Sequence, residues 1–297
     1  MWADRNSCVK RLLTIWILGD GKPGHENQSL GLAEAMRRRV PCDIHRIGPE
    51  SSWESPPVPD VIVAAGHATH GRLWWLARRH RAHSVVLMRP SLPPWLFDFV
   101  IAPRHDFKKP PSPGGRVFAS RGALNRVVPV ADEPRDGKLI LLGGPSKHHG
   151  WDGDAMRGML AEIAGRVPEV ELADSRRTPE GFFASLDFIE ARHHHFDTPP
   201  GWLAARLARA EEVWVTEDSV SMVYEALTGG ARVGILPMPR LRENARVIQG
   251  LDQLADDGWV TRFRAWKETS TLNPPPEPLA EADRAAAWLM DELAIRQ

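Results

Sequence analysis

The chain has 297 residues, of which 42% are hydrophobic and 26% charged, the composition of a globular protein large enough for two domains. Lys and Arg together number 38, as do Asp and Glu, so the net charge of zero lacks the basic excess of nucleic-acid-binding proteins. Two cysteines exclude a disulfide-rich scaffold, and no apolar run reaches the roughly 18 residues of a membrane span. We therefore expect a cytoplasmic protein.

In the first half of the chain, apolar runs that predict buried strands alternate with segments of helical periodicity. The predicted strands are residues 12–18, 43–47, 61–65, 84–88 and 97–102, and the predicted helices begin near residue 30 and at residue 67. This alternation indicates a parallel sheet wrapped by helices. A polar segment with prolines, residues 128–137, is the best candidate for a domain linker.

The alternation restarts after this linker. The predicted strands are residues 138–142, 170–173, 213–215 and 232–236, and the predicted helices are residues 154–165, 202–209, 222–228, 244–256 and 280–295. We therefore predict two α/β domains, residues 1–130 and 131–278, followed by a terminal helix in residues 279–297.

A glycine-rich sequence, GDGKPGHENQS, follows the first predicted strand at residues 19–29. A turn of this kind frees backbone N–H groups ahead of a helix N-terminus, which suits a phosphate group. Lys22 adds a positive charge, and residues 27–29 can cap the helix or contact a ligand. His25, beside Glu26, is a candidate general base. The alternatives are a capped tight turn and a solvated histidine.

A second glycine-rich sequence, GGPSKHHGWDG, stands at the equivalent place in the second half, at residues 143–153. Such a loop can bind a diphosphate through its backbone amides together with Ser146 and Lys147. Two such loops at equivalent positions are harder to explain as turns alone.

The third sequence of interest is TEDSVSMVYEALTGG, residues 216–230. Three hydroxyls and the carboxylate of Asp218 crowd a predicted helix N-terminus, and we expect one of them to cap the helix, which needs no more than one such group. The surplus predicts hydrogen bonds to the phosphates or ribose of a ligand. Glu225, one turn inside the helix, can accept hydrogen bonds from sugar hydroxyls, although a solvated helix face is the alternative.

Three consecutive histidines, His193, His194 and His195, raise the question of a metal site. Consecutive side chains of an extended segment point to opposite faces, so all three cannot meet at one ion. The sequence therefore predicts no metal.

Four motifs together, GDGKPGHENQSLGLAEA, LLGGPSKHHGWD, SRRTP and VTEDSVSMVYEAL, resemble the mitochondrial-fission "elongated mitochondria" family of plants and its bacterial homologues. The resemblance covers most of residues 13–262. That family looks like the GT-B glycosyltransferases. The resemblance implies an α/β fold of two Rossmann-like, doubly wound domains that face each other across a cleft. It also implies that the C-terminal helix, residues 279–297, crosses back toward the first domain.

The resemblance further implies a metal-independent glycosyltransferase that uses a nucleotide-sugar as donor substrate, without a cofactor, and an acceptor that could be lipid-linked at a membrane surface. His25 or Asp20 would act as the base. The motifs and the resemblance together give the residues expected to bind donor or acceptor: Lys22, Gly24, Asn27, Gly143, Gly144, Ser146, Lys147, Thr216, Asp218, Ser219, Ser221, Met222 and Glu225.

Two other functions stay open at this point. One is a ligand-binding or scaffold protein that keeps the pocket without turnover, since one fold hosts many functions. The other is a nucleotide-sugar epimerase, against which the missing dinucleotide-binding fingerprint argues.

Overall fold

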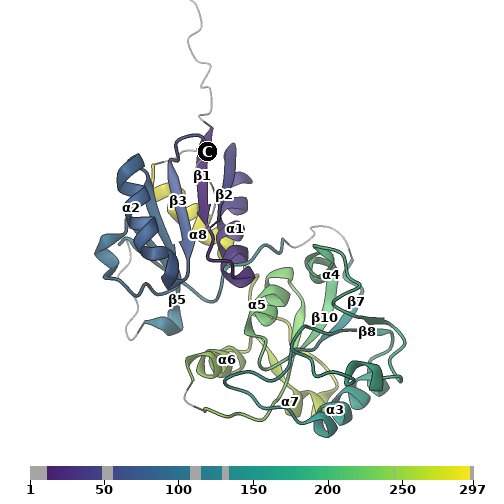
Figure 1. The fold of residues 1–297 in the computed structure, drawn as a ribbon. Helices are drawn as coiled ribbons and strands as arrows, with labels where there is room; N and C mark the ends of the chain where they lie inside the picture. The colour runs from purple at the N-terminus through teal and green to yellow at the C-terminus, as the bar shows by residue number, and fades with distance from the viewer. Residues whose placement is uncertain (1–11, 49–55, 108–114, 129–133, 244, 295–297) are drawn as a thin grey trace, which may run out of the picture. The chain divides into compact units, whose positions relative to one another are not determined.

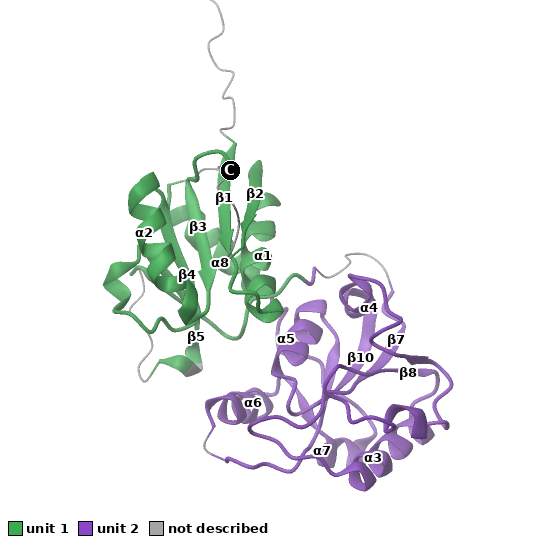
Figure 2. Ribbon diagram, viewed as in Figure 1, with its two compact units in different colours: residues 1–126, 281–297 green, residues 127–280 purple. Residues whose placement is uncertain are grey.

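The computed structural model describes residues 12–48, 56–107, 115–128, 134–243 and 245–294. The chain divides into two compact units, coloured separately in Figure 2: unit 1 is residues 1–126 with 281–297, and unit 2 is residues 127–280. Each unit holds a six-stranded sheet in which every pairing between neighbouring strands is parallel. The predicted α/β class is confirmed.

Unit 1 is built on a sheet of order β2-β1-β3-β4-β5-β6. Its strands are β1 (Leu13–Leu18), β2 (Cys42–Ile47), β3 (Val61–Ala65), β4 (His83–Leu87), β5 (Phe99–Pro103) and β6 (Val117–Ser120). Its helices are α1 (Pro23–Arg37), α2 (His70–His80) and α8 (Glu281–Glu292), which comes from the far end of the sequence (Figure 1).

The core of unit 1 follows from the alternation of side chains along β1. Ile15 and Ile17 pack on one face of the sheet in a cluster that includes residues of α1 and α8. Trp16 and Leu18 lie on the other face in a cluster with α2. A strand buried on both faces requires a continuous apolar run, which is why β1 could be predicted from sequence.

Unit 2 is built on a sheet of order β12-β11-β10-β7-β8-β9. Its strands are β7 (Gly137–Leu141), β8 (Val170–Ala173), β9 (Arg192–His193), β10 (Ala210–Thr216), β11 (Arg232–Leu236) and β12 (Thr261–Arg262). Its helices are α3 (Gly153–Arg166), α4 (Trp202–Arg209), α5 (Val220–Gly229), α6 (Arg246–Asp256) and α7 (Phe263–Thr269).

Each sheet reverses its strand order at one point. In unit 1 the chain runs from β1 to β2 on one side and then to β3 on the other. In unit 2 the strands that follow β7 extend one way and those that follow β10 extend the other. Open α/β sheets bind ligands outside the carboxyl ends of the strands at such a reversal. The loops after β1 and β3, and those after β7 and β10, are therefore the places to look for a site.

The structure differs from the sequence prediction in the start of α1. The helix begins at Pro23, with Lys22 at the N-cap, so residues 24–29 form its first turns rather than a glycine-rich turn. Proline suits the first helical position because its fixed φ matches the helix and its missing N–H needs no partner there. Asn27 and Ser29 therefore cannot cap this helix.

Some elements were not predicted, namely β6, β9, β12 and α7. Two of them, β9 and β12, have two residues each, too few to show a periodicity. Parts of three predictions lie outside the described residues: positions 129–133 of the linker and positions 244 and 295 at helix ends.

Candidate functional site

In unit 1, the side chains of Asp20 and His25 form a hydrogen-bonded pair at the carboxyl end of β1. Nδ1 of His25 lies 2.8 Å from Oδ2 of Asp20. The Asp20 side chain is only 5% exposed, whereas that of His25 is 22% exposed. Asp20 also accepts a hydrogen bond from the backbone N–H of Lys22 at 3.2 Å, which fixes the carboxylate at the start of α1. The structure thus brings together the two residues predicted to act as base.

Gly66, at the carboxyl end of β3, makes room for this pair. A Cβ at this position would lie 2.4 Å from Nδ1 of His25 and 2.8 Å from Oδ2 of Asp20. Its φ of 90° also lies in the region that favours glycine. Because β1 and β3 are neighbours at the reversal of the sheet, the pair stands where a doubly wound fold binds its ligand.

The pKa of Asp20 is lowered from its ordinary value. Burial disfavours the charged form, but the hydrogen bonds from His25 and from the Lys22 backbone, together with the electrostatic attraction of these two neighbouring side chains, outweigh it. Asp20 is therefore the anionic partner that orients the imidazole.

The other residues predicted on this loop lie on the surface. Lys22 is 59% exposed, with its Nζ 3.9 Å from Asp20 Oδ2. Gly24 and Asn27 are exposed in the first turns of α1.

In unit 2, the glycines after β7 are bonded to the loop after β10. The N–H of Gly143 donates to Oγ1 of Thr216 at 2.7 Å, and the N–H of Gly144 donates to Oδ2 of Asp218 at 3.1 Å. The sequence predicted that these two amides face a diphosphate. That prediction needs correction, because the amides already hold the loops after β7 and β10 together at the reversal of the sheet.

Asp218 is the centre of this junction. Its side chain is fully buried, and its Oδ2 also accepts from Arg177 at 2.8 Å and from the hydroxyl of Ser219 at 3.2 Å. The same Nη2 of Arg177 donates to Oγ of Ser219 at 2.8 Å. The surplus of hydroxyl and carboxylate groups predicted to bind a ligand is thus largely committed to internal hydrogen bonds.

Arg177 is the residue that the site prediction missed. Its side chain is 45% exposed, so the guanidinium reaches from the buried carboxylate of Asp218 to the surface. The signal that could have found it was the SRRTP motif, which belongs to the resemblance but lies in a loop without periodicity.

The N-terminus of α5 has no side-chain cap. Ser219 occupies the N-cap position without a capping hydrogen bond, because its hydroxyl is engaged by Arg177 and Asp218. The expectation that a hydroxyl caps this helix was therefore wrong. Ser221 is exposed and Met222 half-buried in the first turn, where unused N–H groups and the helix dipole favour an anion.

Ser146 and Lys147 differ in how far the loop after β7 uses them. The Ser146 hydroxyl accepts hydrogen bonds from the backbone N–H groups of His148 and His149 at 3.2 and 3.1 Å. Lys147 is exposed. Lys147 is therefore the more accessible of the two for a ligand.

Glu225 lies half-buried one turn further along α5. Burial raises the pKa of its carboxyl to about 7. At neutral pH the group is thus divided between a form that can donate a hydrogen bond and one that only accepts.

A cavity of about 650 Å³ opens at the carboxyl ends of β7, β8 and β9 in unit 2. Its size is that of a typical ligand pocket. The structure describes all of the residues that were predicted to bind the donor. Among them, Met222 lines this cavity. The main polar and aromatic residues of its wall are Asp174, Arg176, Arg177, His193, His195 and Trp202.

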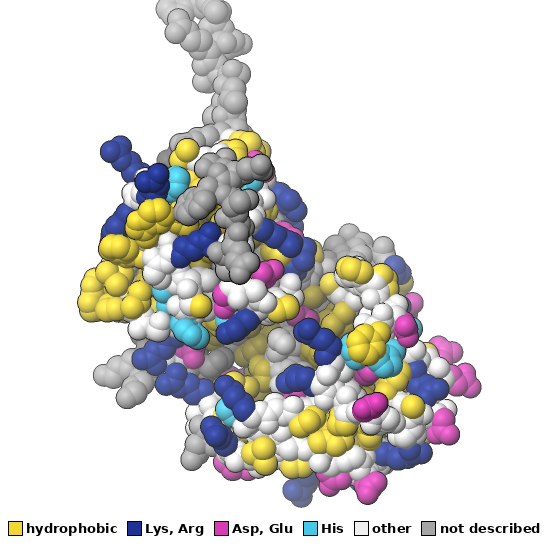
Figure 3. Space-filling view, viewed as in Figure 1, with side chains coloured by type: hydrophobic (Ala, Val, Ile, Leu, Met, Phe, Trp, Pro, Cys, Tyr) yellow, Lys and Arg dark blue, Asp and Glu magenta, His cyan; other side chains and the backbone are white. Residues whose placement is uncertain are grey.

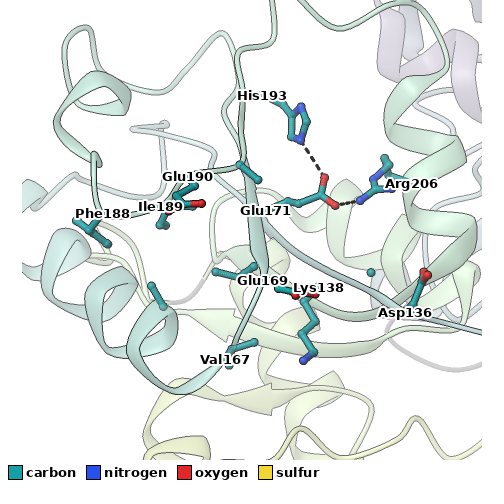
Figure 4. Close-up of a pocket in the computed structure, with 14 residues that line it drawn as sticks. Asp136, Lys138, Val167, Glu169, Glu171, Phe188, Ile189, Glu190, His193 and Arg206 are labelled. Atoms are coloured by element: carbon teal, nitrogen blue, oxygen red, sulfur yellow. Dashed lines mark hydrogen bonds and ion pairs between the residues drawn. The ribbon is translucent and has the colours of Figure 1, made fainter.

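A larger cavity of about 710 Å³ lies at the amino ends of β7 and β8. Figure 4 shows its centre, where Glu171 is paired with His193 on one side and Arg206 on the other. Doubly wound folds bind ligands at the opposite ends of their strands, so we assign the candidate site to the smaller cavity.

The family model of mitochondrial fission ELM1 matches residues 23–293 of the chain. Uncharacterized protein RP120 of Rickettsia prowazekii (strain Madrid E) is 20% identical over 361 residues, which cover 96% of this chain and 100% of that protein.

Three solved structures share the fold over nearly the whole chain. A candidate UDP-N-acetylglucosamine 2-epimerase from Listeria monocytogenes has a TM-score of 0.59 at 12% identity and covers 97% of this chain and 98% of its own. The UDP-GlcNAc 2-epimerase of Neisseria meningitidis, bound to UDP-GlcNAc, has a TM-score of 0.53 at 10% identity, with coverages of 96% and 100%. MurG of Acinetobacter baumannii has a TM-score of 0.52 at 11% identity, with the same coverages. The likeness shows the fold, and it confirms the GT-B-like architecture expected from the sequence.

Proposed function

Since the chain belongs to the mitochondrial fission ELM1 family and has a GT-B-like fold, we propose that it is a glycosyltransferase that binds a nucleotide-sugar through unit 2. The observation that carries the proposal is the cavity of about 650 Å³ at the carboxyl edge of the sheet in unit 2, with Arg177 in its wall. The fold neighbours include proteins that act on UDP-sugars, which supports this class of donor.

In this proposal the diphosphate of the donor is held by Arg177, Lys147 and the N-terminus of α5. Arg177 presents a planar set of N–H donors that suits phosphate oxygens, and Asp218 fixes one edge of it. The uncapped N–H groups of α5 add donors with a favourable dipole. These groups replace the glycine amides in the role that the sequence assigned to them.

The proposed base is His25, with Asp20 as its partner. The acceptor hydroxyl attacks the anomeric carbon of the sugar, the bond from that carbon to the diphosphate oxygen breaks, and the nucleoside diphosphate leaves. His25 takes the hydroxyl proton through its second ring nitrogen, and the Asp20 carboxylate on Nδ1 stabilises the imidazolium that forms. The cationic groups of unit 2 offset the charge of the leaving diphosphate.

Two other functions predict different products. A 2-epimerase would change the sugar of the donor without an acceptor, and the fold neighbours from Listeria monocytogenes and Neisseria meningitidis favour this second candidate over a binding or scaffold protein. A binding or scaffold protein would hold the donor unchanged.

The deciding experiment follows binding and turnover separately. Nucleotides and nucleotide-sugars are screened by thermal shift, because a ligand that binds the folded state raises the apparent stability. Lys147→Ala should reduce the shift by several-fold without changing the melting point of the free protein, since the side chain is exposed. A matched control is Lys138→Ala, at the amino end of β7. If no nucleotide changes the melting temperature, the proposal fails.

Turnover is read from nucleoside diphosphate release and from the sugar product. His25→Ala should abolish release while the thermal shift persists. A product that carries an inverted C2 centre instead of a transferred sugar would establish the epimerase.

We further propose that unit 1 binds a membrane surface, where a lipid-linked acceptor would be found. Among the described residues no helix is long and apolar enough to cross a membrane. Trp74, Trp75 and Trp95 are nevertheless 36%, 45% and 77% exposed on and near α2. The guanidinium of Arg78 lies 4.3 Å from the ring centroid of Trp74, which pairs a cation with an amphipathic ring. Figure 3 shows apolar side chains gathered at the outer edge of unit 1, beside basic ones.

The charge of this region is strongly one-sided. Residues 61–97 contain no Asp or Glu but hold five arginines and four histidines, in a chain whose net charge is zero. Exposed tryptophans with a local positive charge fit the interface of an anionic bilayer. Trp95→Ala should weaken sedimentation with vesicles that contain about 30% phosphatidylglycerol, whereas Phe196→Ala, an exposed aromatic of unit 2, should not. Equal binding to neutral vesicles would refute the role of the arginines.

A further inference from the structure

We propose that Asp174, His194 and His195 of unit 2 form a binding site for a divalent transition-metal cation such as Zn²⁺. One ligand atom from each residue can be chosen so that all of them lie within 4.8 Å of one another. The proposal concerns these side chains alone and does not depend on the proposed transferase activity.

The distances around Asp174 suit a shared ion. Oδ2 of Asp174 lies 3.4 Å from Nε2 of His194, and Oδ1 lies 2.9 Å from Nδ1 of His195. A charged hydrogen bond is normally about 2.7–2.9 Å long, so the first distance is long for one. Two ligands of a tetrahedral zinc ion, each about 2.0–2.1 Å from the metal, lie roughly 3.3 Å apart. The spacing of Asp174 Oδ2 and His194 Nε2 is therefore that of two ligands around a common cation, whereas the 2.9 Å contact between Oδ1 and Nδ1 of His195 has the length of an ordinary hydrogen bond.

The backbone explains how neighbouring histidines come to share a partner. The strand β9 ends at His193, and the N–H of Asp197 then donates to the carbonyl of His194 at 2.9 Å in a turn. The rings of His194 and His195 stack at 4.7 Å between centroids, with 28° between their planes. The argument against a metal assumed an extended segment, in which adjacent side chains point apart. That assumption holds for His193 but not for the next two residues.

The hydrogen bonds within the cluster leave one ring nitrogen without a partner: Oδ1 of Asp174 accepts the backbone N–H of His195 at 2.6 Å and lies 2.9 Å from Nδ1 of His195, but neither contact reaches Nε2 of that ring. The side chain of Asp174 is 4% exposed and sits between two imidazoles. Nε2 of His195 is buried and makes no hydrogen bond to any described residue. A buried polar atom without a partner is costly. Two imidazoles and one carboxylate are a common ligand set for zinc and other divalent transition metals.

The position of the cluster gives the cation an open side. Asp174 and His195 line the cavity of about 650 Å³ at the carboxyl edge of the sheet. With three protein ligands, a tetrahedral ion keeps a fourth position for water or for an oxygen atom of a molecule in the cavity. An anionic ligand in this cavity would thus meet the cation as well as Arg177.

His193 provides a matched control. It is the same residue type one position earlier, but its Nε2 lies 2.9 Å from Oε2 of Glu171, the pairing drawn in Figure 4, and it is not a member of the group of possible ligands formed by Asp174, His194 and His195. His193→Ala should therefore leave cation binding unchanged, whereas His194→Ala and His195→Ala should each weaken it at least tenfold.

The test is calorimetric titration of the full-length, tag-free chain with ZnCl₂, and visible absorption of the Co²⁺ form. We expect one tight site and the intense absorption bands of tetrahedral Co²⁺, both lost in the two cluster variants. Asp174→Asn separates ligation from packing, because the amide preserves shape but is a poor ligand. Binding that is equally weak in all three histidine variants, or absent in the parent chain, overturns the proposal. Circular dichroism of His194→Ala, a half-buried position, shows whether the fold is kept.

Discussion

The loops after β1 and after β7, each at the reversal of its sheet, are both rich in glycine but have different roles. The loop after β1 carries a polar pair, Asp20 and His25, of which the histidine reaches the surface. The loop after β7 donates its glycine amides to Thr216 and Asp218 and is closed by internal hydrogen bonds. The first loop therefore offers side chains for chemistry, and the second positions its neighbours. A glycine-rich turn at a ligand-binding edge can thus serve either to bind or to join.

The largest expected effect tests whether the loop after β7 holds the loop after β10 in place. A Cβ on Gly144 would lie 1.8 Å from the carbonyl oxygen of Arg177, a contact that only movement of the backbone can relieve. We expect Gly144→Ala to destabilise unit 2 by about 3–5 kcal/mol, as overpacking and loss of the buried Asp218 network combine. Urea denaturation measures the loss in the free energy of unfolding. A loss below about 1 kcal/mol would contradict the structural role of this loop.

The second prediction concerns Glu225 in unit 2. Its pKa is raised to about 7 from 4.5, so ionisation costs the folded state free energy. The stability present below pH 4.5 is lost as the pH rises through 7, by about 3 kcal/mol for a shift of this size. Glu225→Gln should remove this dependence. The measurement is the free energy of unfolding at pH 5 and pH 8 for both proteins, and parallel curves would show that Glu225 is not the group.

A smaller effect is expected at Asp20 in the first loop. Because its pKa is lowered in the folded state, its contribution is present above pH 3.8 and lost as the pH falls below that value. Asp20→Asn should cost roughly 1 kcal/mol at pH 7, the value of a hydrogen bond, and should lessen the acid sensitivity. Any catalytic activity should fall far more than stability. Asp43→Asn, which removes the partner of His45 on β2, serves as a control.

The smallest expected effect completes the comparison of the loops. A Cβ on Gly24 would meet no atom within 4 Å, and the residue lies in the first turn of α1. Gly24→Ala should leave stability unchanged or raise it by a few tenths of a kcal/mol, because alanine favours the helix. A loss of stability similar to that of Gly144→Ala would mean that the loop after β1, like the loop after β7, has a structural role.

The sequence was informative wherever one physical cause determines the structure locally. β1 and β3 are buried on both faces, so their apolar runs identified them. The predicted helix at residues 222–228 is likewise followed by glycine, and in the structure α5 ends at Gly229 with Gly230 as its C-cap at a φ of 88°, a conformation that glycine adopts without strain. The two-residue strands β9 and β12 leave no such pattern, because their pairing depends on neighbours already in place.

The site was harder to predict because its hydrogen bonds join distant residues. Thr216 and Asp218 lie 73 and 74 positions from the glycines whose amides they accept. Nothing in the local sequence shows that these amides are occupied. The role of Arg177 likewise depends on the carboxylate of Asp218, 41 residues later in the chain. That contact is seen only in the folded protein.

The return of α8 has a consequence for biosynthesis. Ala285, Ala286 and Leu289 of this helix are fully buried in the core of unit 1, and the carboxylate of Glu281 accepts the N–H of Arg121 at 2.8 Å. Unit 2 is continuous in sequence, from residue 127 to residue 280. On the ribosome, unit 2 can therefore fold as soon as it emerges, whereas unit 1 must wait with an open core until α8 is released. A stop codon near position 280 would damage the half of the protein that is translated first.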